Sequence, residues 1–268
     1  MFDLGKTRAR RFLLASALVA AGGLTVVASL PAMAAEGAAL PKQEWSFSGP
    51  FGKFDRAQLQ RGFQVFKEVC ASCHSMGLIS FRNLAESGGP EFPEDAVKAL
   101  AAEYEVQDGP DKDGEMFTRP ALPSDRIPAP FANEQAARAS NNGSLPPDLS
   151  VITKARHGGA DYIYALLSGY EEAPADIELR DGMSYNAYFT GHQIAMPAPL
   201  FEDAVEYSDG TAGTVEQYAK DVAAFLTWAG EPSLEARHKM CLNVMIYLVI
   251  LAGLLYAAKR RLFSSVDH

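Results

Sequence analysis

Two long apolar runs lie near the ends of the chain, and residues 240–258 form the one that predicts a membrane span. This run is 19 residues long and carries no charge and a single amide, Asn243. At about 1.5 Å per residue, a helix of this length crosses the hydrocarbon core of a bilayer. A soluble core helix would show a polar face, which is absent here. We therefore expect residues 234–268 to hold one transmembrane helix and a short tail, and Lys259, Arg260 and Arg261 favour a cytoplasmic tail.

The other apolar run, residues 12–30, follows a basic stretch and precedes Ala32-Met33-Ala34. A basic start, an apolar centre and a small-x-small site are typical of an export signal. We expect residues 1–34 to be cleaved, with a retained anchor as the alternative. Arg10-Arg11 also hints at a twin-arginine signal, which leaves the export route open. Either route places the rest of the chain outside the cytoplasm.

Between the runs, apolar residues recur at helical spacing. Asp55 and Gln58 predict the start of a helix that runs to Cys70 and packs Phe63 and Phe66 in the core. A second helix follows Pro93, and a short one covers residues 161–167. The last begins at a capping box of Thr214 and Gln217, ends before Glu231-Pro232, and buries one stripe: Tyr218, Val222, Phe225, Leu226 and Ala229. The expected fold is all-α, with residues 35–233 as one domain.

Residues 107–131 are rich in proline and glycine, so we expect a long loop without regular structure. Acidic residues gather at its start: Glu103, Glu105, Asp108, Asp111, Asp113 and Glu115. A solvated charge run is one interpretation, and a docking surface for a basic partner is the other.

Composition and charge narrow the class of protein. With 48% hydrophobic and 21% charged residues, the 268-residue chain is globular. Its net charge is −9, and loss of the four basic residues and one acidic residue of the signal changes this to −12. So acidic a protein repels nucleic acid and suits a basic protein partner, although surplus charge also keeps domains soluble.

The candidate chemistry lies in Cys70-Ala71-Ser72-Cys73-His74. Two thiols three residues apart, followed by an imidazole, form the attachment motif of a c-type haem. Each thiol bonds one vinyl group, and His74 becomes the proximal ligand of the iron. A disulfide would strain so short a loop, and zinc would need about four ligands. A thioredoxin-like dithiol leaves His74 unexplained.

An electron-transfer haem usually has a second axial ligand. The candidates are Met76, Met116, Met183, Met196, His157 and His192. Met76 is too close to His74 to reach the opposite face of the haem. Prolines follow Met196 and stiffen an extended loop that can present a thioether, whereas Met183 and His192 lack that support. Met196 therefore leads, although methionine is also a common core residue.

Further segments stand out along the chain. They are Arg61-Gly62-Phe63-Gln64-Val65-Phe66 before the haem motif, Asn141-Asn142-Gly143 with Pro146-Pro147-Asp148-Leu149-Ser150, Ala155-Arg156-His157-Gly158-Gly159 with Asp161-Tyr162, Tyr188-Phe189 to Ile194-Ala195-Met196-Pro197, and Ala219-Lys220-Asp221-Val222 with Trp228-Ala229 and Glu231-Pro232. Together they resemble the cytochrome c1 family over nearly all of the chain after the signal. The loop between the predicted axial ligands lacks the long, cysteine-containing insertions of some bacterial relatives.

The resemblance implies one covalent haem c and a set of residues around it. His74 and Met196 become the axial ligands, and Arg156 becomes a partner for a haem propionate. Tyr162 and the Pro146-Pro147 bend become walls of the haem pocket, and Asn142 of the neighbouring motif is assigned to the same pocket. The roles of Tyr162, the Pro146-Pro147 bend and Asn142 rest on the resemblance alone.

The resemblance also implies partners and a location. A Rieske iron–sulfur protein would reduce the haem, which would then reduce a soluble cytochrome c, within the dimeric quinol–cytochrome c oxidoreductase (cytochrome bc1) complex. Cytochrome b would lie beside the membrane helix, in the bacterial inner membrane, with the haem domain in the periplasm. A haem subunit of a terminal oxidase and a peroxidase-like enzyme are the alternatives. The oxidase subunit would have an N-terminal anchor, and the peroxidase would need an open iron position.

Overall fold

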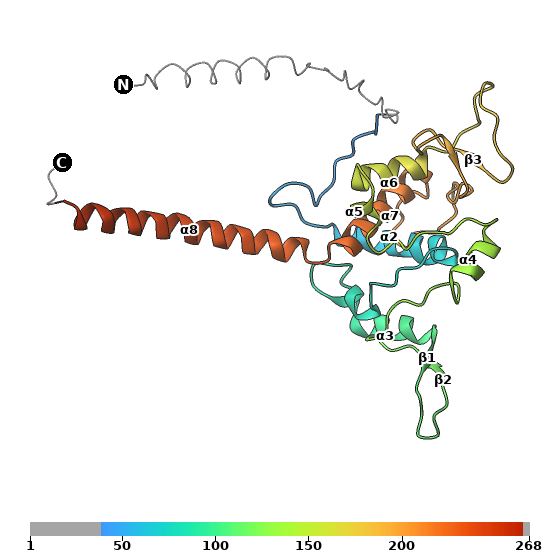
Figure 1. Cartoon of the computed structure of the whole chain (residues 1–268), viewed down its shortest axis with the longest axis horizontal. Helices are drawn as coiled ribbons and strands as arrows, with labels where there is room; N and C mark the ends of the chain where they lie inside the picture. Colours follow the sequence, from blue (N-terminus) through green and yellow to red (C-terminus); the bar gives the residue numbers. More distant parts are fainter. Residues whose placement is uncertain (1–38, 265–268) are drawn as a thin grey trace, which may run out of the picture. The chain divides into compact units, whose positions relative to one another are not determined.

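The computed structural model describes residues 39–264, so the predicted export signal at 1–34 lies outside the described residues. The described chain is mainly helical with a few short strands, which confirms the all-α prediction (Figure 1). Its elements in order are α2 (Arg56–Glu68), η1 (Cys70–Ser72), η2 (Phe81–Ala85), α3 (Glu94–Ala102), β1 (Glu105–Asp108), β2 (Phe117–Pro120), α4 (Glu134–Ser140), α5 (Ile152–Ala155), α6 (Gly159–Ser168), β3 (Ser184–Tyr185), β4 (Gln193–Ile194), α7 (Val215–Gly230) and α8 (Leu234–Leu262).

Both predicted capping residues begin their helices. Asp55 accepts a hydrogen bond from the Gln58 amide at the start of α2, and Thr214 accepts one from the Gln217 amide at the start of α7, each at 3.2 Å. The two glutamine side chains do not return to their caps. Both donate instead to the Asp221 carboxylate, at 3.2 and 2.9 Å, so only half of each capping box forms. The side-chain amides of Gln58 and Gln217 therefore point to the buried Asp221 carboxylate between α2 and α7.

Helices α2 and α7 cross in close contact, which fixes the helix that leads to the cysteines. A Cβ atom on Gly62 would lie 2.1 Å from the Asp221 carbonyl oxygen, so only glycine allows this approach. Phe63 and Phe66 pack on Phe225 with ring centroids 5.6 and 5.8 Å apart, as their core prediction requires. The predicted stripe of α7 is buried throughout: Tyr218, Val222, Phe225, Leu226 and Ala229.

A buried ion pair sets the register of this crossing. The Asp221 side chain is completely buried, and Arg61 on α2 approaches its Oδ2 atom at 2.8 Å. Arg61 also pairs with the partly exposed Asp209 at 2.8 Å. An isolated buried carboxylate would be costly, so its hydrogen bonds and charge partner must form together with the helix contact.

The prediction that residues 107–131 form a loop without regular structure is wrong in one part. Strands β1 and β2 pair antiparallel, with Val106 opposite Arg119. Most of the hairpin's residues are exposed or only half-buried, so it shows no alternation of apolar and polar residues that could reveal it in the sequence. Arg119 holds it by pairing with Asp108 within the hairpin and with Asp125 beyond it.

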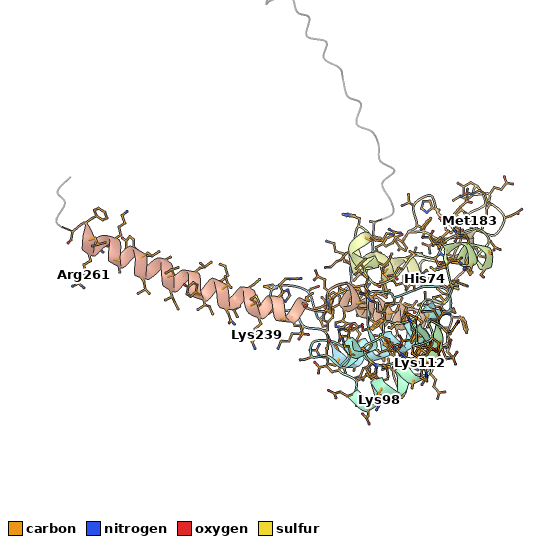
Figure 2. All side chains as sticks on the ribbon, turned by 60° about the horizontal axis from the view of Figure 1, so that its bottom comes forward. His74, Lys98, Lys112, Met183, Lys239 and Arg261 are labelled. Atoms are coloured by element: carbon orange, nitrogen blue, oxygen red, sulfur yellow. The ribbon has the colours of Figure 1, made fainter. Side chains whose placement is uncertain are left out.

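Helix α8 is 29 residues long and contains the predicted span 240–258. In the described part of the chain it alone is long and apolar enough to cross a membrane, with a mean hydropathy of 2.2 in its most apolar window. Figure 2 shows Lys239 at the end of α8 nearer the folded domain and Arg261 near the opposite end. At 1.5 Å per residue these two residues are about 33 Å apart, which is compatible with a transmembrane helix.

The first turn of α8 is tied to the domain by two ion-pair groups, which we call the α7–α8 joint. Glu235 pairs with Arg56 of α2 at 2.7 Å. Glu231, in the short link between the helices, pairs with Lys154 of α5 at 2.8 Å and with Arg237 of α8 at 2.6 Å. Partners from α2 and α5 therefore hold the start of α8 from two sides.

Candidate functional site

The two cysteines lie in a tight turn that continues α2. The helix ends at Glu68, and the turn η1 follows at once. The amides of Cys73 and His74 both donate to the Cys70 carbonyl, at 3.1 and 2.9 Å. This turn holds two half-buried thiols close together and begins the chain segment that carries His74. Neither thiol is in a disulfide.

The state of the thiols argues against a redox dithiol. Burial, with a smaller contribution from Cys73, raises the pKa of the Cys70 thiol to about 12. A nucleophilic redox cysteine needs the opposite, a lowered pKa and a thiolate. Within residues 39–264, no group of three or more His, Cys, Asp or Glu side chains is arranged to hold a metal ion. The zinc alternative therefore has no ligand set in that part of the chain.

The His74 ring is held by a main-chain acceptor. Its Nδ1 atom lies 2.8 Å from the carbonyl oxygen of Pro147. A carbonyl only accepts hydrogen bonds, so Nδ1 carries the proton and Nε2 keeps its lone pair. Burial lowers the pKa of His74 more than Pro147 and Asp148 raise it, so the ring is neutral near pH 7. A neutral imidazole with one nitrogen fixed by a carbonyl is the form that binds a metal.

Asp148 fastens the segment that supplies this carbonyl, and the sequence analysis did not identify it. Its Oδ2 atom accepts hydrogen bonds from the Ser75 hydroxyl at 2.7 Å and the Gly77 amide at 2.8 Å. Its Oδ1 atom accepts one from the Ser150 amide at 2.8 Å. The carboxylate thus joins the chain after His74 to the chain after Pro147. The sequence did contain a hint of this role, because Asp148 directly follows two prolines, and aspartate and proline are both common in turns.

Met196 lies just after β4, on a loop anchored through its main chain. The Tyr170 hydroxyl donates to the Met196 carbonyl at 3.0 Å. The Met196 side chain is half-buried and packs against the hydrophobic core. Asn186, buried and bonded to the Leu166 carbonyl at 2.7 Å, folds the intervening loop back on α6. Tyr170 and Asn186 were not predicted, because their partners are distant in the sequence.

The other candidate sulfur and imidazole ligands have different surroundings. Met76 is fully buried in the core, and Met116 is 58% exposed in the turn between β1 and β2. Met183 lies on the loop directly before β3, and Figure 2 labels it on the haem-domain side of the molecule together with His74. The His192 ring stacks on Tyr185, with its Nδ1 atom 3.3 Å from a main-chain carbonyl. Met196 as the second ligand therefore stays a prediction.

Electrostatic effects link Arg156 to Tyr162, and Tyr162 to Tyr170, whose hydroxyl bonds the Met196 carbonyl. Burial raises the pKa of Tyr162, and the nearby Arg156 charge opposes that shift. Burial also raises the pKa of Tyr170, and Tyr162 contributes to the same shift. Arg156 is exposed and makes one long hydrogen bond, 3.4 Å to the Ala155 carbonyl. Its planar group has donors left for a carboxylate ligand.

Asn142 is not joined to these residues by any hydrogen bond of the described chain. It is exposed, has a φ of 51°, and forms a turn with Gly143, as predicted for this segment. Its amide nitrogen lies 3.7 Å from where a Cβ atom on Gly182 would be. The structure therefore places Asn142 beside the loop before β3.

The donors fit a c-type haem: two thiols for two vinyl groups, an imidazole with a free Nε2, and a thioether on a separate anchored loop. A family model described as the Cytochrome C1 family matches residues 45–266. The chain belongs to the cytochrome c1 family. Cytochrome c1 proteins are haem proteins of electron transport, and this chain has an electron-transfer role as a member of the family.

Relatives in bacteria and in mitochondria support this assignment to cytochrome c1. Cytochrome c1 of Rhodospirillum rubrum is 46% identical, over 94% of this chain and 97% of its own. "Cytochrome c1 2, heme protein, mitochondrial" of Arabidopsis thaliana is 48% identical, over 98% of this chain and 85% of its own. "Cytochrome b/c1" of Bradyrhizobium diazoefficiens is 48% identical over 93% of this chain, which spans only 39% of that relative.

Proposed function

We propose that the chain carries one haem c, bonded through thioethers to Cys70 and Cys73, with His74 and Met196 as axial ligands. When bound, this group supplies a one-electron iron couple. The contact between His74 Nδ1 and the Pro147 carbonyl carries the proposal, because it leaves Nε2 free directly after the two thiols. Membership of the cytochrome c1 family supports it independently.

The surrounding residues would set the properties of the site. Pro147 orients the imidazole, and the Met196 thioether favours a comparatively high potential. A second protein ligand also closes the iron to small molecules, which favours an electron carrier over a peroxidase. Arg156 would pair with a propionate. Tyr162 and Pro147 would form walls of the pocket, and Asn142 would border it from the neighbouring turn.

We further infer that this chain works in a cytochrome bc1 complex, which would be dimeric. It would accept an electron from the Rieske iron–sulfur protein and pass it to a soluble cytochrome c. The name "Cytochrome b/c1" of the Bradyrhizobium relative supports cytochrome b as a neighbour of α8. The chain would provide the electron path and no separate catalytic activity.

The proposed location follows from the charges around α8. Residues 1–34 would be removed during export, and the haem domain would lie in the periplasm of a bacterium. Lys259, Arg260 and Arg261 at the end of α8 would remain in the cytoplasm. The inner membrane would then be crossed once, by the segment 240–258.

The test is to purify the full chain with its associated subunits from membranes. We expect a c-type pyridine haemochrome spectrum from haem that acidic acetone does not extract, and reduction of this haem by added quinol. A Cys70→Ser, Cys73→Ser double variant should lose the covalently bound haem. Haem that is extracted from the unaltered chain would contradict covalent attachment.

The same preparation separates the alternatives. Ready binding of carbon monoxide or cyanide would indicate an open iron position and favour a peroxidase-like enzyme. Oxygen reduction that copurifies with the chain, in place of quinol-dependent reduction of cytochrome c, would indicate a terminal oxidase.

A further inference from the structure

One apolar side chain is presented to solvent by a well-ordered turn next to α8. Residues 46–53, which we call the Phe51 loop, close through main-chain hydrogen bonds from Gly52 to Gly49 at 3.2 Å and from Lys53 to Ser46 at 3.0 Å. The Phe51 side chain at its tip is 72% exposed. A single exposed aromatic ring is common on protein surfaces, so the position of Phe51 relative to α8 decides what it can contact.

The base of the Phe51 loop is fixed to the core, so Phe51 cannot simply fold inward. Phe47 and Phe54 are 9% and 4% exposed, and their rings lie 4.9 Å apart. Trp45 stacks on Phe47 at 5.4 Å. A Cβ atom on Gly52 would lie 2.2 Å from the Phe47 carbonyl oxygen, which shows how tightly the turn is closed. Three aromatic residues thus hold the turn in place, and the fourth is left outside.

Contacts with α8 determine the height of this loop relative to the proposed membrane span. The Nδ1 atom of His238 lies 3.3 Å from the Gly52 carbonyl, and the Phe54 amide donates to Glu235 at 2.9 Å. The apolar segment begins at Met240, two residues after His238 and so about 3 Å further along the helix axis. The headgroup layer of a bilayer is about 5 to 8 Å thick on each side. If the membrane span starts at Met240, the Gly52 end of the Phe51 loop lies at the level of the headgroups.

We propose that the Phe51 loop is a second membrane contact, with Phe51 inserted into the interfacial layer of the leaflet next to the haem domain. This inference rests on the proposed function, in which α8 spans the membrane. A lipid surface fits better than a protein partner, because two exposed cations belong to the segments in contact here and would match anionic headgroups above acyl chains. Lys53 follows Phe51 by two residues, and Lys239 follows His238, which contacts the Gly52 carbonyl. A protein interface would require a broader complementary patch.

Collision measurements on spin labels test the proposal in the full-length haem protein. A single nitroxide is placed at Phe51→Cys, at Phe201→Cys or at Leu248→Cys, each in a Cys241→Ser background, in vesicles of phosphatidylcholine and phosphatidylglycerol. Phe201 is the matched control, because it is 66% exposed. It also precedes α7, whose 16 residues separate it from the α7–α8 joint by about 23 Å of helix. Leu248 reports on the span itself.

We expect the ratio of collisions with oxygen to collisions with a water-soluble nickel chelate to be several-fold higher at 51 than at 201. An aqueous ratio at 51, together with a lipid-like ratio at 248, would overturn the loop proposal and leave the membrane anchor intact. Aqueous ratios at both positions would overturn the anchor itself. In the purified complex, shielding of residue 51 from both reagents would show that a protein subunit covers the loop, which would also overturn the proposal.

Discussion

At the scale of single residues, burial and a hydrogen bond to Pro147 have opposite effects on the pKa of His74, and together they leave the ring neutral. Burial lowers the pKa of the ring, and the Pro147 carbonyl raises it by a smaller amount. The same carbonyl fixes the proton on Nδ1 at 2.8 Å. The imidazole is therefore neutral, and its Nε2 atom is unprotonated before any metal arrives.

Replacing Met196 tests the second ligand. In Met196→Leu we expect a lower haem potential and loss of the weak red absorption, because a thioether ligand favours the reduced iron. A redox titration with optical detection measures both. Met183→Leu, on the loop before β3, is the control and should leave both unchanged. An unaltered potential in Met196→Leu would point to a different ligand.

Replacing Asp148 tests the fastening of the Pro147 segment. Burial by itself would raise the pKa of Asp148, but hydrogen bonds from Ser150, Gly77 and Ser75 outweigh it and hold the pKa below 3.8. The carboxylate therefore stabilises the fold above about pH 4, and this contribution is lost as the pH falls further. In Asp148→Asn we expect about 1 kcal/mol less stability at pH 7, because an amide cannot accept all of these bonds.

Guanidinium unfolding of the haem protein at pH 7 measures the loss. Asp176→Asn, an exposed carboxylate on another loop, is the control and should unfold at the parent midpoint. Equal midpoints for Asp148→Asn and its parent would show that the three hydrogen bonds do not support the site.

The sequence predicted the chemistry-bearing side chains of the candidate site, but it gave no role to Asp148 and Tyr170, which hold the neighbouring segments in place. Cys70, Cys73 and His74 are recognisable because their spacing is local. Asp148 and Tyr170 act through partners 71–73 and 26 residues away, respectively. Hydrogen bonds across such separations leave no periodic pattern. They emerge only when the fold brings the segments together.

At the scale of elements, amphipathic helices were predictable and the β1–β2 hairpin was not. The stripes of α2 and α7 face one core, so their spacing records the packing directly. The hairpin has no buried face, and its pairing depends on Arg119 and main-chain hydrogen bonds. The helix starts were predicted only in part. The caps at Asp55 and Thr214 were correct, but the side chains of Gln58 and Gln217 bond to the buried Asp221 and not to the caps.

The α7–α8 joint gives a pH-dependent prediction. Hydrogen bonding to Arg237, with a further contribution from Lys154, lowers the pKa of Glu231 from 4.5 to about 2. A lowered carboxylate pKa stabilises the folded state fully above pH 4.5, and that stabilisation disappears as the pH falls toward 2. We expect Glu231→Gln to lower stability at pH 7 by up to about 1 kcal/mol, since the site is partly solvated.

Thermal unfolding in detergent between pH 7 and pH 2 measures this effect. The difference between Glu231→Gln and its parent should shrink as the pH falls below 4.5. The exposed Glu172→Gln variant should match the parent throughout. A difference that stays constant with pH would show that the ion pairs are not its source.

At the scale of the whole molecule, the net charge predicts how a basic redox partner associates: it is −9 for the full sequence and −12 without residues 1–34. Attraction between opposite net charges raises the association rate and weakens once the Debye length falls below about 10 Å. In the structure Glu103 and Asp108 of the predicted acidic run are paired with Lys67 and Arg119. Three of the remaining four residues, Asp111, Asp113 and Glu115, lie in the turn between β1 and β2, and the fourth, Glu105, lies in β1.

We expect cytochrome c reduction by the complex to slow as salt rises. Neutralising the turn with Asp111→Asn, Asp113→Asn and Glu115→Gln should reduce that salt dependence. The matched control neutralises Glu171, Glu172 and Asp176 on the loop before β3. If the control variant reduces the salt dependence more, the docking surface lies on the loop before β3. If turnover of the parent does not depend on salt, docking is not electrostatic.

The α7–α8 joint also decides where this protein can be shortened to give a water-soluble haem domain. A stop after Gly230 would delete Glu231, Glu235 and Arg237, so that Lys154 would lose Glu231 and Arg56 would keep only its second carboxylate partner, Glu91. A stop after Lys239 would keep both ion-pair groups and remove the apolar segment that begins at Met240. The longer fragment should crystallise and keep its redox behaviour, because the first turn of α8 belongs to the domain and not to the membrane.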